Sequence, residues 1–251
     1  MALSAIIIGI NPDEINFTLE SFAGTKKYID EIIVVHSCQN FKPEEHYNNT
    51  PNYPIIRGVY TERLGICAAF NHGLRMSESE YVVYVNSGDE LILEGLVSAT
   101  QMLSTSPSVI ASAVKICTPT SNLSTLWTGL DPKCQIVQIH QQGTIYKKSL
   151  HDIHGTYSTL FKCAMDTAFF GSILSSKANY HIAYNPAPVV KFYTGGKSYI
   201  NKHQTALEHS LINILKSESP VRTFFLTLPL LSLKLGALKI RHLFYSFSSI
   251  K

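Results

Sequence analysis

The sequence has few charged residues and no cysteine pattern that would cross-link a small fold. Charged side chains account for 16% of the 251 residues and the formal net charge is only +3, a surplus too small to indicate nucleic-acid binding by itself. The five cysteines are dispersed without a C-x-x-C pair, which is typical of reduced thiols in a cytoplasmic protein. Hydrophobic residues make up 45% of the chain, enough to fill the core of one domain.

The apolar N-terminal segment lacks the features of a secretory leader. No basic residue precedes residues 4–10, and a polar turn that starts at Asn11 ends the run abruptly. A signal peptide needs a basic start and a longer apolar core, so we expect a buried first strand over residues 5–10. A helix should follow, because Asn11, Pro12 and Glu14 occupy the positions of an N-cap, a first-turn proline and a capping-box acid.

Short β-branched runs then alternate with segments of helical period. We expect strands at residues 31–35, 54–60 and 81–85, and helices at 65–76 and 93–103. This alternation predicts a mainly parallel sheet with right-handed crossovers, which binds ligands at the carboxyl ends of its strands. After about residue 106 the rhythm loosens, and the expected elements are strands at 109–115, 135–140, 143–146, 180–184 and 189–193 and helices at 165–175 and 198–216.

The tetrapeptide Asn86-Ser87-Gly88-Asp89 follows the most apolar of these strands. A carboxylate at the carboxyl end of a strand, on a turn of small residues, can hold Mg²⁺ or Mn²⁺ against a diphosphate. An ordinary turn in which Asp89 caps the next helix explains the same four residues equally well.

The surroundings of this turn resemble the core of the family 2 glycosyltransferases. Residues 65–74 match the family's GI-x-x-A-x-N-x-G helix, and residues 80–89 match its GEY-x-x-F-L-N-S-x-D strand. The Asn-x-Gly-Asp ending is similar to that of bacterial exopolysaccharide and colanic-acid-type transferases. The resemblance implies a GT-A (Rossmann-like) α/β fold, a mainly parallel sheet flanked by helices, in which Asp89 binds a divalent metal, Mn²⁺ or Mg²⁺. Ser87 stands where the motif has an earlier Asp, which leaves one carboxylate instead of two.

Two downstream segments extend the resemblance. Residues 140–150 resemble the family's HQ-x-x-F-Y-x-R-x-L segment, and residues 155–170 resemble its G-x-Y/F-D…Y-x-I-A-x-D-Y-D-F-F segment. The resemblance implies that Asp166 is the catalytic base and that His140 and Gln141 lie near the acceptor or the diphosphate. Taken alone, Asp166 is equally suited to cap its helix and to interact with the helix dipole, and a lone His at a strand end is more often structural.

A glycine pair near the end of the domain completes the expected donor site. Residues 192–198 end in Gly-Gly-Lys-Ser, but Lys191 occupies the position of the first P-loop glycine. The segment instead resembles a GG-x-S loop that folds over the donor. The second strand of the family usually ends in Asp, where this chain has His36, so the nucleotide stays open, with a UDP-sugar as the expected donor. The implied donor-binding residues are Ile10, His36, Glu62, Asn71, Ser87, Gly88, Gly195, Gly196 and Lys197.

The C-terminal segment differs in composition from the rest of the chain. We expect a GT-A domain at 1–218 and a helical extension at 219–251. Residues 220–251 contain no Asp or Glu, but five basic residues among many Leu, Phe and Ile. The apolar stretch 224–238 is shorter than the roughly 20 residues that span a bilayer, so the tail is suited to lie on the anionic inner face of the plasma membrane. A helix packed on the domain, or a dimer contact, is the alternative.

The combined features predict an inverting, metal-assisted glycosyltransferase. It would move a sugar from a nucleoside-diphosphate sugar to a hydroxyl of a saccharide or polyprenyl-linked acceptor, in surface polysaccharide synthesis, without nucleic-acid partners. Ser87 and His36 leave open a catalytically silent nucleotide-sugar-binding subunit. A nucleotidyltransferase would share the sheet, but the first strand is not followed by a glycine-rich phosphate loop. Trp127 is available to stack on a sugar ring, although a lone Trp is more often a packing residue.

Overall fold

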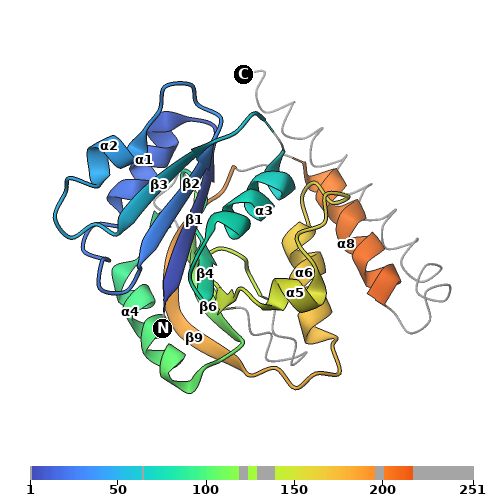
Figure 1. The fold of residues 1–251 in the computed structure, drawn as a ribbon. Coiled ribbons are helices and arrows are strands. Elements are labelled where there is room, and N and C mark those ends of the chain that lie inside the picture. Colours follow the sequence, from blue (N-terminus) through green and yellow to red (C-terminus); the bar gives the residue numbers. More distant parts are fainter. Residues whose placement is uncertain (1, 64, 119–123, 129–138, 196–200, 217–251) are drawn as a thin grey trace.

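A computed structural model describes residues 2–63, 65–118, 124–128, 139–195 and 201–216 (Figure 1). Over these ranges a nine-stranded sheet runs through the molecule, with helices on both faces (Figure 1). The strands that form one path follow the order β3-β2-β1-β4-β8-β6-β9-β5, and β7 pairs with β6 beside that path.

The N-terminal half of the sheet is parallel, as predicted. Strands β1 (Leu3–Gly9), β2 (Glu31–His36) and β3 (Ile55–Tyr60) lie in register, so that Gly9, His36 and Tyr60 end side by side. Strand β4 (Tyr81–Tyr84) joins the other side of β1. The connecting helices are α1 (Pro12–Glu20), α2 (Pro43–Tyr47) and α3 (Ile66–Met76). Of these elements, the sequence did not predict α2.

The other half of the sheet mixes both strand directions. Short β8 (Ile145–Lys147) lies antiparallel between β4 and β6 (Val109–Cys117), whereas β9 (Ile182–Tyr193) runs parallel to β6. The remaining strands are β5 (Glu90–Leu91) and β7 (Ser124–Trp127), and the helices are α4 (Leu93–Met102), α5 (Leu150–His154), α6 (Met165–Leu174) and α8 (Lys202–Lys216), with a 3₁₀ turn at Leu103–Thr105. The mainly parallel arrangement therefore holds for the first half only.

Two of the predictions for the second half of the sheet need correction. The strands expected at 180–184 and 189–193 are one strand, because a shift of register beside Ser112 and Ala113 lets β9 continue past Pro186 and Pro188. Proline has no N–H for a sheet ladder and is tolerated where pairing is irregular. The strand expected at 135–140 falls mostly outside the described residues, and its last residue, His140, lies in no strand.

Two buried clusters, one on each face of the sheet, hold these layers together. The first contains Ile15 and Leu19 of α1 and Leu96 of α4, and the second contains Phe70 of α3 and Phe169 of α6. Helix α1 starts as predicted, since the side chain of Asn11 accepts the N–H of Asp13 at 3.0 Å and a proline follows it. Each of these helices thus packs apolar residues against the sheet.

The described chain ends at Lys216, the last residue of α8. The predicted tail at 219–251 and the domain boundary at 218 lie outside the described residues. Within the ranges that are described, no helix is long and apolar enough to cross a membrane.

Candidate functional site

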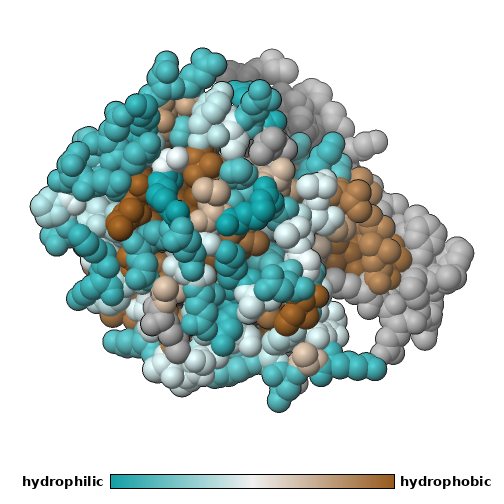
Figure 2. All heavy atoms as spheres, viewed as in Figure 1, coloured by the Kyte–Doolittle hydropathy of each residue, from teal (hydrophilic) through white to brown (hydrophobic). Residues whose placement is uncertain are grey.

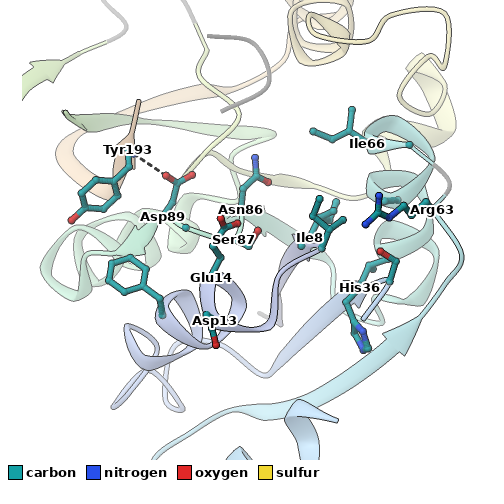
Figure 3. Close-up of a pocket in the computed structure, with 18 of the residues that line it drawn as sticks. Ile8, Asp13, Glu14, His36, Arg63, Ile66, Asn86, Ser87, Asp89 and Tyr193 are labelled. Atoms are coloured by element: carbon teal, nitrogen blue, oxygen red, sulfur yellow. Dashed lines mark hydrogen bonds between the residues drawn. The ribbon is translucent and has the colours of Figure 1, made fainter. Parts of the chain in front are cut away.

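A cavity of about 940 Å³ opens at the carboxyl ends of β1, β2 and β4 (Figure 3). Its wall is built from the residues that follow these strands, from the start of α3, and from the end of β9. The structure brings together seven residues of the predicted donor and metal sites there: Ile10, His36, Glu62, Ser87, Gly88, Asp89 and Gly195. The rule that parallel sheets bind ligands at the ends of their strands therefore located the cavity.

Asp89 is a buried carboxylate in the wall of this cavity. Gly88 adopts φ +87°, a conformation that favours glycine, and Thr18 of α1 accepts the Gly88 N–H at 3.0 Å while donating to the Asp89 carbonyl at 2.8 Å. The Asp89 side chain is 5% exposed, and its Oδ1 accepts the N–H of Tyr193 at 2.8 Å (Figure 3). Burial raises the pKa of Asp89 to about 7, against the smaller lowering effect of the Tyr193 N–H.

The contacts of Asp89 do not match a helix cap. Helix α4 begins at Leu93, its N-cap is Ile92, and no side chain caps it. The Asp89 carboxylate instead bonds to the last residue of β9, which lies 104 positions later in the chain. The alternative interpretation, in which Asp89 caps the next helix, is therefore wrong.

Acidic side chains outnumber basic ones in the described wall of the cavity. Asp13, Glu14, Glu62 and Asp89 all line it, and Arg63 is the basic residue beside them. A diphosphate would meet a net negative surface here. A bound cation would offset the repulsion between the two negative charges.

The wall offers limited ligands for a metal ion. Asp89 contributes one carboxylate, and the buried Oδ1 of Asn86 has no hydrogen-bond partner. In the part of the chain that the structure describes, no group of three or more His, Cys, Asp or Glu side chains could hold a metal ion. These residues fit Mg²⁺ or Mn²⁺ only if phosphate oxygens complete the coordination, which is the usual arrangement for these ions.

His36 ends β2 at the other side of the cavity. Its ring is 3% exposed, lies 5.2 Å from the ring of Phe41 and 6.1 Å from that of Tyr60, and its Nδ1 is buried without a partner. Burial lowers the pKa of His36, against the smaller opposing effects of the Cys38 backbone and of the charge of Glu44. A neutral imidazole with an unused nitrogen in a cavity wall can donate or accept one hydrogen bond.

The segment of His140 and Gln141 lies beside the carboxyl end of β4. Gly143 donates its N–H to the Tyr84 carbonyl at 3.1 Å, and the side chain of Gln142 accepts the Asn86 N–H at 2.9 Å. The His140 ring lies 5.3 Å from that of Phe192, which lines the cavity, and 5.6 Å from that of Trp127. His140 and Gln141 themselves are not among the residues that line the cavity.

Asp166 lies in the first turn of α6, close enough to His140 to affect its titration. Burial lowers the pKa of His140, and the charge of Asp166 opposes this shift. Asp166 accepts the N–H of Thr167 at 2.8 Å, is partly exposed, and is not among the residues that line the cavity. Asp166 thus lies outside the described cavity wall, and its charge acts on His140, whose ring lies 5.3 Å from that of Phe192.

One predicted donor residue, Asn71, is not part of the described wall. Asn71 is buried in α3 and bonds in both directions to the backbone of Tyr157, at 2.8 and 2.9 Å, which is a structural contact. Gly196 and Lys197 lie outside the described residues.

The wall also contains residues that were not predicted as site residues, among them Asp13, Glu14, Arg63 and Tyr193. Asp13 and Glu14 were interpreted only as the start of a helix. Asp13 and Glu14 lie in the first turn of α1, whereas Arg63 follows β3 and Tyr193 ends β9, so a stricter use of the strand-end rule would have found the last two.

Solved structures share this fold. The structure is similar to that of S. aureus TarS 1-349, with a TM-score of 0.62 and 19% identity over 89% of this chain and 68% of that chain. The complex of TarS 1-349 with UDP-GlcNAc gives a TM-score of 0.63, with 18% identity over 89% and 69% of the two chains. The longer S. aureus TarS structure gives 0.61 and 19%, over 89% and 41%. The fold class is thus that of the GT-A glycosyltransferases.

The sequence matches the model of a protein family. Residues 4–162 match the model of glycosyl transferase family 2, which covers β1 to the loop before α6. The chain belongs to this family and is a glycosyltransferase. No curated protein matches the chain.

Proposed function

We propose that the protein transfers a sugar from a nucleoside-diphosphate sugar to a hydroxyl group of a saccharide or lipid-linked acceptor. The observation that carries the proposal is the position of Asp89, a buried carboxylate at the carboxyl end of β4 in the wall of a 940 Å³ cavity. Family membership supports the reaction class. A cavity of this volume is in the range of pockets that enclose a small ligand.

A UDP-sugar is the proposed donor. The similar TarS fold has been solved with UDP and with UDP-GlcNAc. In this chain the unpartnered Nδ1 of His36 is available to bond the nucleoside, and the guanidinium of Arg63 is available to the diphosphate. His36 replaces the acid usual at this position, so we expect a nucleoside contact through a neutral ring.

Mn²⁺ or Mg²⁺ is the proposed cofactor, held by Asp89 with help from the Asn86 amide oxygen and from the diphosphate. The ion would offset the charge of the departing nucleoside diphosphate. The excess of acids in the wall supports a need for it. Because Ser87 supplies no carboxylate, we expect the ion to bind together with the nucleotide and weakly without it.

Asp166 is the proposed base. In an inverting transfer, the acceptor oxygen forms a bond to the anomeric carbon as the bond from that carbon to the diphosphate oxygen breaks, and the acceptor proton passes to the Asp166 carboxylate. A base in such a position contributes about 10²–10⁴-fold in rate. His140, on which the charge of Asp166 acts, and Trp127, whose ring lies 5.6 Å from that of His140, are proposed to lie on the acceptor side.

The C-terminal segment is proposed to contact the inner face of the plasma membrane. The reaction would take place there, as a step of surface polysaccharide synthesis. Residues 220–251 are basic and apolar without an acid. Helix α8, which precedes them, exposes Leu207, Leu211 and Leu215, spaced four apart on one face, and Figure 2 shows an apolar patch there. Sedimentation with anionic vesicles tests the contact, and protein that stays in the supernatant would refute it.

Thermal unfolding with a panel of nucleotides tests the donor proposal. UDP or its sugar conjugates with Mn²⁺ should raise Tm, because a ligand at 100 times its Kd adds about 2.7 kcal/mol of stability. A manganese-dependent shift that Asp89→Ala abolishes would support the metal and donor sites together. If nucleotides bind but no donor is hydrolysed or transferred, the protein is a catalytically silent nucleotide-sugar-binding subunit. Ser87, which leaves Asp89 as the lone carboxylate of the motif, favours this alternative.

A further inference from the structure

The residues that lead into α6 are held by a carboxylate from another helix. Glu208 of α8 accepts the backbone N–H groups of Lys162, Cys163 and Ala164 at 2.9, 2.8 and 2.9 Å. Gln204, one turn earlier in α8, donates to the same carboxylate at 2.7 Å. Four donors therefore converge on one side chain that is only 4% exposed.

This clamp supplies what the sequence of the loop lacks. The N-cap of α6 is Ala164, which has no side-chain acceptor, and Glu208 instead accepts the N–H of Ala164 and of the two residues before it. A carboxylate at this end also interacts favourably with the helix dipole. Burial by itself would raise the pKa of Glu208, but the bonds from Gln204 and from the three backbone groups outweigh it and lower the pKa, so the clamp favours the charged form.

The same loop is anchored at its other end by α3. Asn71 pairs with the backbone of Tyr157, and the Cys67 thiol donates to the Phe161 carbonyl at 2.8 Å. The residues between Tyr157 and α6 are thus fixed from two helices. Asp166 follows the Glu208 clamp by two residues, so any movement of the clamped backbone would move its carboxylate.

We infer that Glu208 is a positioning residue for sugar transfer, which sets the place of Asp166 by fixing residues 162–164. The inference rests on the proposed role of Asp166 as the base. It makes α8 part of the catalytic apparatus, although α8 contributes no described residue to the donor cavity. Loss of the clamp should therefore impair transfer and spare nucleotide binding.

Glu208→Gln in the full-length protein is the test, with Glu31→Gln as its matched control. Glu31 is also a buried carboxylate, 8% exposed, that accepts a backbone N–H, from Glu78 at 2.8 Å. It lies at the amino end of β2, the opposite end from the cavity. Both variants lose a buried charge with backbone partners, so both should lower Tm.

Only Glu208→Gln should lower kcat for transfer, by about tenfold to 100-fold as expected for a misplaced catalytic group, with the donor KM within about twofold of wild type. Hydrogen exchange followed by mass spectrometry gives a readout that needs no turnover. Amides of residues 162–167 should exchange faster in Glu208→Gln and not in Glu31→Gln. Glu208→Asp, which restores the charge, should recover part of both effects.

Two results would overturn the inference: unchanged exchange at 162–167, or a kcat equal to that of Glu31→Gln at the same folded fraction. Asp166→Asn separates this failure from failure of the proposed function. If Asp166→Asn abolishes transfer and Glu208→Gln does not, the positioning role alone is wrong. If Asp166→Asn retains turnover, the proposed base is wrong and the positioning role falls with it.

Discussion

Replacing Asp89 by Asn should stabilise the protein in the absence of ligands. Folding buries the carboxylate, and its pKa rises from 3.8 to about 7. Between these values the unfolded chain has lost the proton while the folded protein retains it, so wild-type stability falls as pH rises through this window and is level above it. Asn keeps an oxygen to accept the Tyr193 N–H and has no charge to bury.

The size of the gain follows from the pKa change. Each unit corresponds to about 1.4 kcal/mol, so a rise of roughly three units is on the order of 4 kcal/mol. The advantage of Asp89→Asn should therefore grow from about pH 4 to pH 7 and remain constant at pH 8. For a chain of this size, 1 kcal/mol moves Tm by about 2–4 °C, which predicts a Tm about 10 °C higher at pH 8.

Chemical denaturation of both proteins at pH 5 and pH 8 is the assay, and UDP with Mn²⁺ is the second arm. The ligands should stabilise wild type, whose ionised carboxylate can hold the ion, and leave Asp89→Asn unchanged. Asp13→Asn is the control, since this exposed side chain lines the same cavity but stays hydrated on folding. Equal stability of wild type and Asp89→Asn at pH 8, or a difference that does not vary with pH, would refute the argument that burial controls this carboxylate.

Three further predictions concern the rest of the site and the core. Asp166→Asn should reduce transfer by at least about 10²-fold while keeping the nucleotide-induced rise in Tm; transfer near the wild-type rate would remove Asp166 from the mechanism. Asn71→Leu should lose about 1–3 kcal/mol, because the Tyr157 N–H and carbonyl lose their partners, and a lost nucleotide shift in a folded variant would instead show a donor role. Burial lowers the pKa of His151 from 6.5 to about 4, so the unfolded chain takes up this proton first as pH falls. Wild type should lose up to about 1.4 kcal/mol per pH unit through that window. Urea titrations of wild type and His151→Asn should therefore converge toward pH 4; parallel curves would contradict the assignment.

Local features of the sequence were sufficient for the elements that carry the cavity. The run 81–85, continuous in apolar residues, predicted a central strand, and β4 lies between β1 and β8. The spacing of apolar residues in α1 and α3 identified their buried faces. Short elements escaped prediction: α2 and α5 have five residues each, too few for a periodic pattern, and tertiary packing stabilises helices of this length.

The roles of individual side chains divide in the same way. The turn at Asp89 could be identified as a candidate ligand site because a strand end and small residues are local properties. Asn71 was predicted to contact the donor by its place in a motif, but its amide is engaged by Tyr157, which lies 86 residues later. A sequence motif shows which residue type is present, but it does not show which residue hydrogen-bonds to that side chain in the folded protein.

The sequence by itself determined the alternation of the longer strands and helices in the first half of the chain, the family, and the edge of the sheet where a ligand would bind, because these depend on short-range periodicity and turn chemistry. Only the tertiary structure decided the environment of each carboxylate. Tyr193 reaches Asp89 across 104 residues, and Glu208 reaches the start of α6 across 44 to 46. Burial and hydrogen bonding at such distances depend on how the layers pack, and they set the pKa of Asp89 and the anchoring of the loop before Asp166.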